Sequence, residues 1–117
     1  MTHPHIRPAT HADLPFIASL IAALNVIPQH RCLHCDEDVA SIQRSMAQLT
    51  TPIEQTFVVA EHNGALVGVV GSDNDESQGR GWLWGPFADI EPWDATVDAL
   101  LAQLMTQLPA AVRQLDD

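Results

Sequence analysis

The sequence has only two cysteines, five basic residues and no run of apolar residues long enough to cross a membrane. Two cysteines are too few for a disulfide scaffold, so we expect a reducing compartment. Residues 1–7 also lack the basic and apolar regions of a signal peptide. These absences together predict a cytoplasmic protein that does not act at a membrane.

The charge balance is acidic, with fifteen acidic residues against five basic ones and a net charge of −10. This sign argues against nucleic acid or an anionic membrane as a partner, because both would repel the chain. A cationic small molecule or protein partner suits it better, and solubility alone is the simpler explanation. With 117 residues, 46% of them hydrophobic, residues 1–117 are expected to form a single domain with its own core.

Residues 56–71 show the clearest local pattern, two β-branched runs separated by His62, Asn63 and Gly64. Asn-Gly tolerates the positive φ angles of a tight type I′ turn, so the segment predicts a β-hairpin. Both runs are apolar on both faces. We therefore expect a sheet that is covered by helices on each side.

Helical patterns precede and follow this hairpin. Thr10 and Asp13 resemble a capping box at the start of the first helix, and later apolar residues recur at helical spacing. Acidic residues from Asp36 suit the start of the second helix. The predicted elements are a strand at 5–8, helices at 10–24 and 36–49, the hairpin at 56–71, a polar loop at 72–79, a strand at 81–88, a helix at 93–108 and a further strand at 111–115.

This order of elements resembles the front portion of the GNAT superfamily of acyl-CoA-dependent N-acyltransferases. Residues 6–15, IRPATHADLP, look like the opening of that family, and residues 59–68, VAEHNGALVG, look like its second and third strands. The resemblance implies an α/β fold of order β-α-α-β-β-β-α-(β), with a mainly antiparallel sheet flanked by helices, truncated relative to a full acyltransferase. It also implies acetyl transfer from acetyl-CoA to an amine.

The segment expected to bind the cofactor departs from the family pattern. In the family, a glycine-rich loop and the helix after it present free N–H groups to the cofactor pyrophosphate. Residues 85–94 instead contain two prolines and three acids, and no glycine beyond the first position. Weak or absent binding of acetyl-CoA is therefore expected. The positions that the resemblance assigns to the cofactor are Phe87, Ala88 and Ile90.

The catalytic groups implied by the resemblance are also hard to find. The family reaction needs a base, a backbone N–H that polarises the thioester carbonyl, and frequently a tyrosine that protonates the leaving thiolate. This chain has no tyrosine. Glu61, at the end of the second predicted strand, is the candidate base. The alternative is a solvated carboxylate or an ion-pair partner.

Aromatic residues gather around the strand at 81–88 and the loop after it. Alternation along a strand places Trp82 and Trp84 on the same face. They either pack a helix against the sheet or, with Trp93, line a substrate cleft where the fourth and fifth strands of a GNAT fold separate.

Two further functions remain open, a non-catalytic binding or assembly module with a GNAT-like fold and a small metal-binding protein. The metal hypothesis rests on residues 30–35, which supply four potential ligands, His30, Cys32, His34 and Cys35. A structural zinc usually needs two separate ligand pairs, so other histidines would have to be recruited. No metal site is predicted on balance.

Finally, we expect a homodimer. The resemblance implies more sheet and a further helix than residues 1–117 provide, and a second copy is the simplest cover for the sheet left open.

Overall fold

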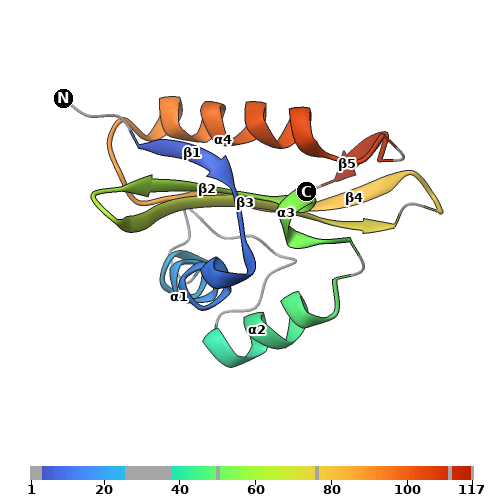
Figure 1. Cartoon of the computed structure of the whole chain (residues 1–117), viewed down its shortest axis with the longest axis horizontal. Helices are drawn as coiled ribbons and strands as arrows, with labels where there is room; N and C mark the ends of the chain where they lie inside the picture. Colours follow the sequence, from blue (N-terminus) through green and yellow to red (C-terminus); the bar gives the residue numbers. More distant parts are fainter. Residues whose placement is uncertain (1–3, 26–37, 50, 76, 111, 117) are drawn as a thin grey trace.

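The structure is a computed structural model of the chain, and it describes residues 4–25, 38–49, 51–75, 77–110 and 112–116 (Figure 1). Five strands form one sheet, and helices lie on both of its faces. The elements in order are β1 (His5–Pro8), η1 (His11–Asp13), α1 (Leu14–Asn25), α2 (Val39–Ala47), α3 (Ile53–Thr56), β2 (Phe57–His62), β3 (Ala65–Asp75), β4 (Arg80–Ala88), α4 (Trp93–Gln107) and β5 (Gln114–Asp116).

The strands follow one another across the sheet in the order β1-β2-β3-β4-β5. The first three pairings are antiparallel, and β4 pairs with β5 in parallel. Between β2 and β3, Asn63 has φ 53° and Gly64 has φ 80°, both positive as a type I′ turn requires. The predicted hairpin is therefore confirmed.

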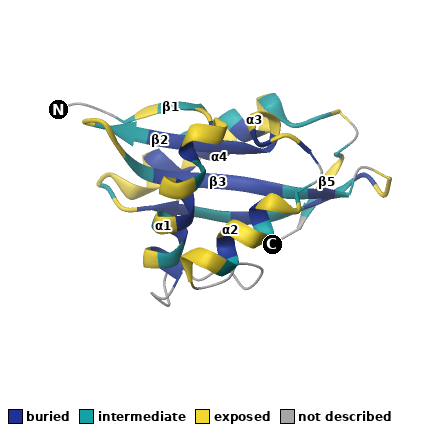
Figure 2. Cartoon of the chain, turned by 60° about the horizontal axis from the view of Figure 1, so that its bottom comes forward, coloured by how far each residue is buried: buried dark blue, intermediate teal, exposed yellow. Residues whose placement is uncertain are grey.

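Both faces of the sheet are buried, as the apolar strands predict. Phe57 and Val59 belong to a core with residues of α1 and α2, whereas Val58 and Ala60 belong to a second core with residues of α4. Figure 1 shows α4 on one side of the sheet and α1 and α2 on the other. Figure 2 shows that the buried residues run along β2 and β3, the central strands. Alternate residues of one strand thus serve different cores.

Several boundaries differ from the predictions, most of them by one to three residues. β3 continues to Asp75, so the first half of the predicted loop at 72–79 is strand. Ser72 and Asn74 are buried there, and the Ser72 hydroxyl donates a hydrogen bond to the Asn74 side-chain oxygen. These polar residues look like a loop in the sequence, but pairing with β4 and mutual hydrogen bonding keep them in the sheet.

The second helix ends at Ala47 rather than at residue 49, and a separate turn of helix, α3, precedes β2. Thr56 therefore ends α3 instead of opening the hairpin, and its hydroxyl donates to the Pro52 carbonyl oxygen. At the other end of the chain, β5 begins at Gln114, three residues later than the predicted 111.

Candidate functional site

The second half of β4 lies at an edge of the sheet. β5 pairs with β4 only from Arg80 to Trp82, so in the described part of the chain residues 84–88 have a strand neighbour on the β3 side alone. Trp84 pairs with Gly71 and Phe87 with Val69, which leaves two residues of β4 opposite a single residue of β3. This irregularity is a bulge, a common device for redirecting a strand near a binding site.

The residues assigned to the cofactor lie at the end of this strand. Phe87 and Ala88 are fully buried, Phe87 in the core beneath α1 and α2. Ile90 is half-buried, and the N–H of Asp89 donates to the Val67 carbonyl oxygen at 2.8 Å. The buried side chains of Phe87 and Ala88 serve the core. A cofactor role for these residues stays a prediction, and it would have to use their backbone.

A carboxylate of the chain itself occupies the N-terminus of α4. The backbone N–H of Trp93, the first residue of the helix, donates to Oε2 of Glu91 at 3.3 Å. A helix N-terminus favours an anion through its free N–H groups and its dipole, and here that anion is a side chain. Asp89 and Asp94 are exposed on either side of Glu91 in the sequence. The side chains around this helix start are therefore negatively charged, whereas a site that binds phosphate is normally neutral or positive.

The three tryptophans of the predicted cleft are spread along β4 and beyond its end. Trp84 is 5% exposed and meets the ring of Phe57 edge-on, with ring centroids 5.5 Å apart. Trp82 is half-buried near the start of β4, where the guanidinium of Arg80 lies 5.4 Å from its ring centroid. Trp93 is exposed at the start of α4. Trp84 thus fits the core alternative, and the substrate-cleft assignment stays a prediction.

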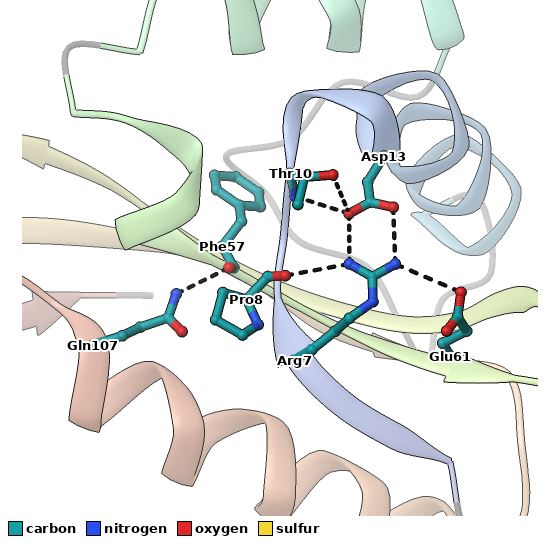
Figure 3. Close-up of polar contacts among 7 residues, drawn as sticks. All are labelled: Arg7, Pro8, Thr10, Asp13, Phe57, Glu61 and Gln107. Atoms are coloured by element: carbon teal, nitrogen blue, oxygen red, sulfur yellow. Dashed lines mark hydrogen bonds and ion pairs between the residues drawn. The ribbon is translucent and has the colours of Figure 1, made fainter.

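A network of ionic side chains joins β1, the start of the first helix and β2 (Figure 3). Arg7 Nη1 lies 2.8 Å from Asp13 Oδ2 and Arg7 Nη2 lies 3.0 Å from Asp13 Oδ1. The backbone N–H of Thr10 donates to the same Asp13 Oδ2 at 2.8 Å, as the capping pattern predicts. Hydrogen bonds from Arg7 lower the pKa of Asp13, and those to Asp13 raise the pKa of Arg7.

Glu61 is the outer member of this network. Its Oε2 lies 3.6 Å from Arg7 Nη2, and its side chain is 38% exposed. The alternative of an ion-pair partner therefore fits the structure. β3 separates β2 from β4, so Glu61 lies two strand spacings, about 10 Å, from β4. Its role as a base stays a prediction.

Sequence reasoning missed most of this network. The Thr10 and Asp13 spacing indicated the capping contact, but nothing local to the sequence linked Arg7 to Glu61, which β1–β2 pairing brings together.

The candidate metal ligands at residues 30–35 lie outside the described residues. In the part of the chain that the structure describes, no group of three or more His, Cys, Asp or Glu side chains could hold a metal ion. Among those same residues, no helix is both long enough and apolar enough to span a membrane.

Comparison with known proteins gives the fold a name. No protein-family model and no curated protein sequence matches the chain. Its structure is similar to diaminobutyrate acetyltransferase EctA from Paenibacillus lautus, solved with L-2,4-diaminobutyric acid and coenzyme A. The TM-score is 0.65 and the identity 19%, over 97% of this chain and 61% of that chain.

Two other solved structures agree. An acetyltransferase of the GNAT family from Streptococcus pneumoniae matches with a TM-score of 0.59 and 20% identity, over 92% of this chain and 68% of that chain. N-acetylglutamate synthase from Neisseria gonorrhoeae, complexed with coenzyme A and N-acetyl-glutamate, matches with a TM-score of 0.59 and 21% identity, over 91% of this chain and 22% of that chain.

The chain therefore has the mixed α/β fold of the GNAT acetyltransferases, and the resemblance predicted from the sequence is confirmed at the level of fold. It spans 61% of EctA and 22% of the N-acetylglutamate synthase. The activities of those whole proteins are consequently a matter for proposal in this chain.

Proposed function

We propose that this chain is a GNAT-type N-acyltransferase domain, of the class that transfers an acetyl group from acetyl-CoA to an amine, with a degenerate cofactor site. On its own it binds acetyl-CoA weakly or not at all. A cytoplasmic location, expected from the low cysteine content, belongs to the same proposal.

The GNAT-like fold supports the first part of the proposal. β4 has a bulge where it pairs with β3, and in the described residues its second half does not pair with β5. The next element along the chain is α4. In the GNAT fold the acyl arm of the cofactor lies where these two strands separate, and the pyrophosphate lies at the start of the following helix. The chain thus has the framework for such a site.

One observation carries the second part, the carboxylate of Glu91 on the N–H of Trp93. A pyrophosphate at this helix start would have to displace Glu91 and approach two further exposed acids. Each unscreened repulsion costs about 1 kcal/mol at 4 Å in water, and more where the charges are partly shielded. Pro86 and Pro92 also supply no N–H to a phosphate.

Isothermal titration calorimetry with acetyl-CoA tests the proposal. We expect a dissociation constant weaker than about 100 μM, which corresponds to a binding free energy of about 5.5 kcal/mol at most. EctA from Paenibacillus lautus, whose structure contains coenzyme A, is a suitable positive control. Low-micromolar affinity for this chain would overturn the degenerate site.

A non-catalytic binding or assembly module with the same fold is the second candidate. Within the described residues, the edge of β4 at 84–88 has no strand neighbour on the side away from β3. This favours the second candidate, because an edge with unpaired backbone groups is a ready place for another strand. Absence of acetyl transfer, together with self-association of the chain, would favour this candidate over the enzyme.

A further inference from the structure

We propose that the groove between the end of α4 and the start of β5 binds a small amphipathic anion, a single carboxylate carried on an unbranched alkyl chain. The groove lies at the opposite end of α4 from Glu91, and the inference does not depend on acetyl-CoA binding. It rests on the apolar lining of the groove and on one arginine that has no partner in the described part of the chain.

The groove has a volume of about 480 Å³, within the range of small-molecule sites. Figure 1 shows β5 beside the C-terminal end of α4, and these two elements form its walls. Its larger apolar side chains come from β4, from α4 and the segment after it, and from β5: Leu83, Met105, Leu108, Val112 and Leu115. Leu83, Leu108 and Leu115 also pack against the second core, so the groove adjoins that core.

Backbone hydrogen bonds hold the segment between α4 and β5 in place. The N–H of Val112 donates to the Pro109 carbonyl oxygen at 3.0 Å. The N–H groups of Arg113 and Gln114 both donate to the carbonyl oxygen of Gly79, at 2.8 and 3.0 Å. The wall of the groove is therefore formed before a guest arrives, which reduces the entropy lost on binding.

Arg113 is the only charged residue among the described residues that line the groove. The other arginines of the described ranges each have a side-chain partner, which is Asp13 for Arg7, Ser41 for Arg44 and Trp82 for Arg80. Arg113 is exposed, and no described residue forms an ion pair or hydrogen bond with its guanidinium. The charge and the N–H donors of this side chain are therefore available to an anion.

One guanidinium beside an apolar groove matches one carboxylate on a hydrocarbon chain. A carboxylate carries the single charge that Arg113 can balance, and it accepts two parallel hydrogen bonds from a guanidinium. The alkyl chain can pack on Met105, which is 54% exposed and has a side chain that adapts to its neighbours. The net charge of −10 repels anions in general, so binding at the groove requires this local complementarity.

A nuclear magnetic resonance titration of the full chain with sodium octanoate, in the absence of acetyl-CoA, tests the inference. The signals of Met105, Arg113 and Leu115 should shift saturably, with a dissociation constant on the order of 1 mM for a ligand of this size. Octylammonium has the same chain and the opposite charge, and it should bind the groove at least about tenfold more weakly although the net charge of the protein favours it. Equal binding of the two compounds, or no saturable shift at these residues, would overturn the proposal.

Butanoate tests the contribution of the alkyl chain. Each methylene that the groove buries should strengthen binding several-fold, so the shorter acid should bind at least about tenfold more weakly than octanoate. Equal affinity for the two acids would mean that the apolar lining takes no part, and it would contradict the proposal.

Three variants sharpen the test. Arg113→Gln removes the charge from an exposed side chain, and it should weaken octanoate binding about tenfold or more. Met105→Gln makes an exposed part of the lining polar and should also weaken binding while the protein still folds. Arg44→Gln is the matched control, because Arg44 is an exposed arginine on α2 outside the groove. Equal weakening by Arg44→Gln and Arg113→Gln would show general charge attraction and would contradict a site.

A second copy of the chain is the competing occupant of the groove. If a second copy fills it, dilution of the protein without octanoate should shift the signals of Met105 and Leu115, and octanoate should compete with self-association. That result would overturn the proposal. Saturable octanoate binding to protein that sedimentation shows to be monomeric would support it.

Discussion

Arg7 and Asp13 form a bidentate ion pair, with nitrogen–oxygen distances of 2.8 and 3.0 Å, that ties β1 to the start of the first helix (Figure 3). The same carboxylate receives the backbone N–H of Thr10. The side chain of Asp13 thus fixes the direction of the backbone between β1 and the first helix. Removing either partner would leave a partly buried charge without its counter-ion, which costs more than the pair itself contributes.

The first prediction concerns this carboxylate. Asp13→Asn should lower the free energy of unfolding by about 2 kcal/mol, because the amide cannot accept both hydrogen bonds from Arg7. Urea denaturation at neutral pH measures the loss. Asp98→Asn, which removes an exposed carboxylate of α4, is the control and should change stability by less than about 0.5 kcal/mol.

The second prediction is the pH dependence of the same pair. Hydrogen bonds from Arg7 lower the pKa of folded Asp13 below its unfolded value. Its contribution is therefore fully present above about pH 4 and is lost as the pH falls through the lowered folded pKa. Urea denaturation from pH 6 to pH 2 should show the wild type and Asp13→Asn converging in acid. A stability difference that stays constant over this range would contradict the role of the ionised pair.

The third prediction concerns Gly71, which lies directly beneath the ring of Phe57. A Cβ at residue 71 would overlap three atoms of that ring. Because Phe57 also packs edge-on against Trp84, the ring has little freedom to move. Gly71→Ala should destabilise the protein by about 2 kcal/mol, as overpacking of a core does.

Gly68→Ala is the matched control for Gly71, since it lies in the same strand. There a Cβ would approach its neighbours only to 3.2 Å, so a smaller loss is expected. Thermal melting of the two variants provides the comparison. Equal losses of stability in the two variants would mean that contact with the ring of Phe57 is not the reason for a glycine at residue 71.

The fourth prediction tests the charge at the start of α4. Asp89→Gly combined with Glu91→Gly should strengthen any residual binding of acetyl-CoA, because it frees the Trp93 N–H and removes two repulsive charges. Calorimetry measures the affinity. Glu54→Gln with Asp73→Asn removes two acidic groups elsewhere and should have a smaller effect. Unchanged affinity in the loop variant would mean that charge is not what limits binding.

The fifth prediction is self-association, most simply as a two-fold dimer. In the described residues the edge of β4 at 84–88 lacks a second strand neighbour, and Met105 is 54% exposed on α4. The net charge of −10 per chain opposes association, so salt should strengthen the dimer by screening the repulsion. Sedimentation at micromolar concentration tests this. A monomer at both low and high salt would contradict it.

Much of the fold follows from local sequence. Asn63 and Gly64 determine the hairpin turn because few residues accept positive φ angles, and the apolar runs beside them require cover on both faces. Thr10 and Asp13 mark the start of the first helix because their interaction spans only three residues. Such short-range constraints can be read in the sequence because the interacting groups are neighbours along the chain.

The tertiary structure alone decided what lies at the candidate sites. Burial placed the side chain of Phe87 in the core, and pairing with β4 extended β3 through polar residues to Asp75. Strand pairing also brought Arg7 within reach of Glu61, far away in the sequence. Burial and ion pairing depend on which distant segments meet, and that depends on the packing of the whole sheet and its helices, so no local pattern could supply it.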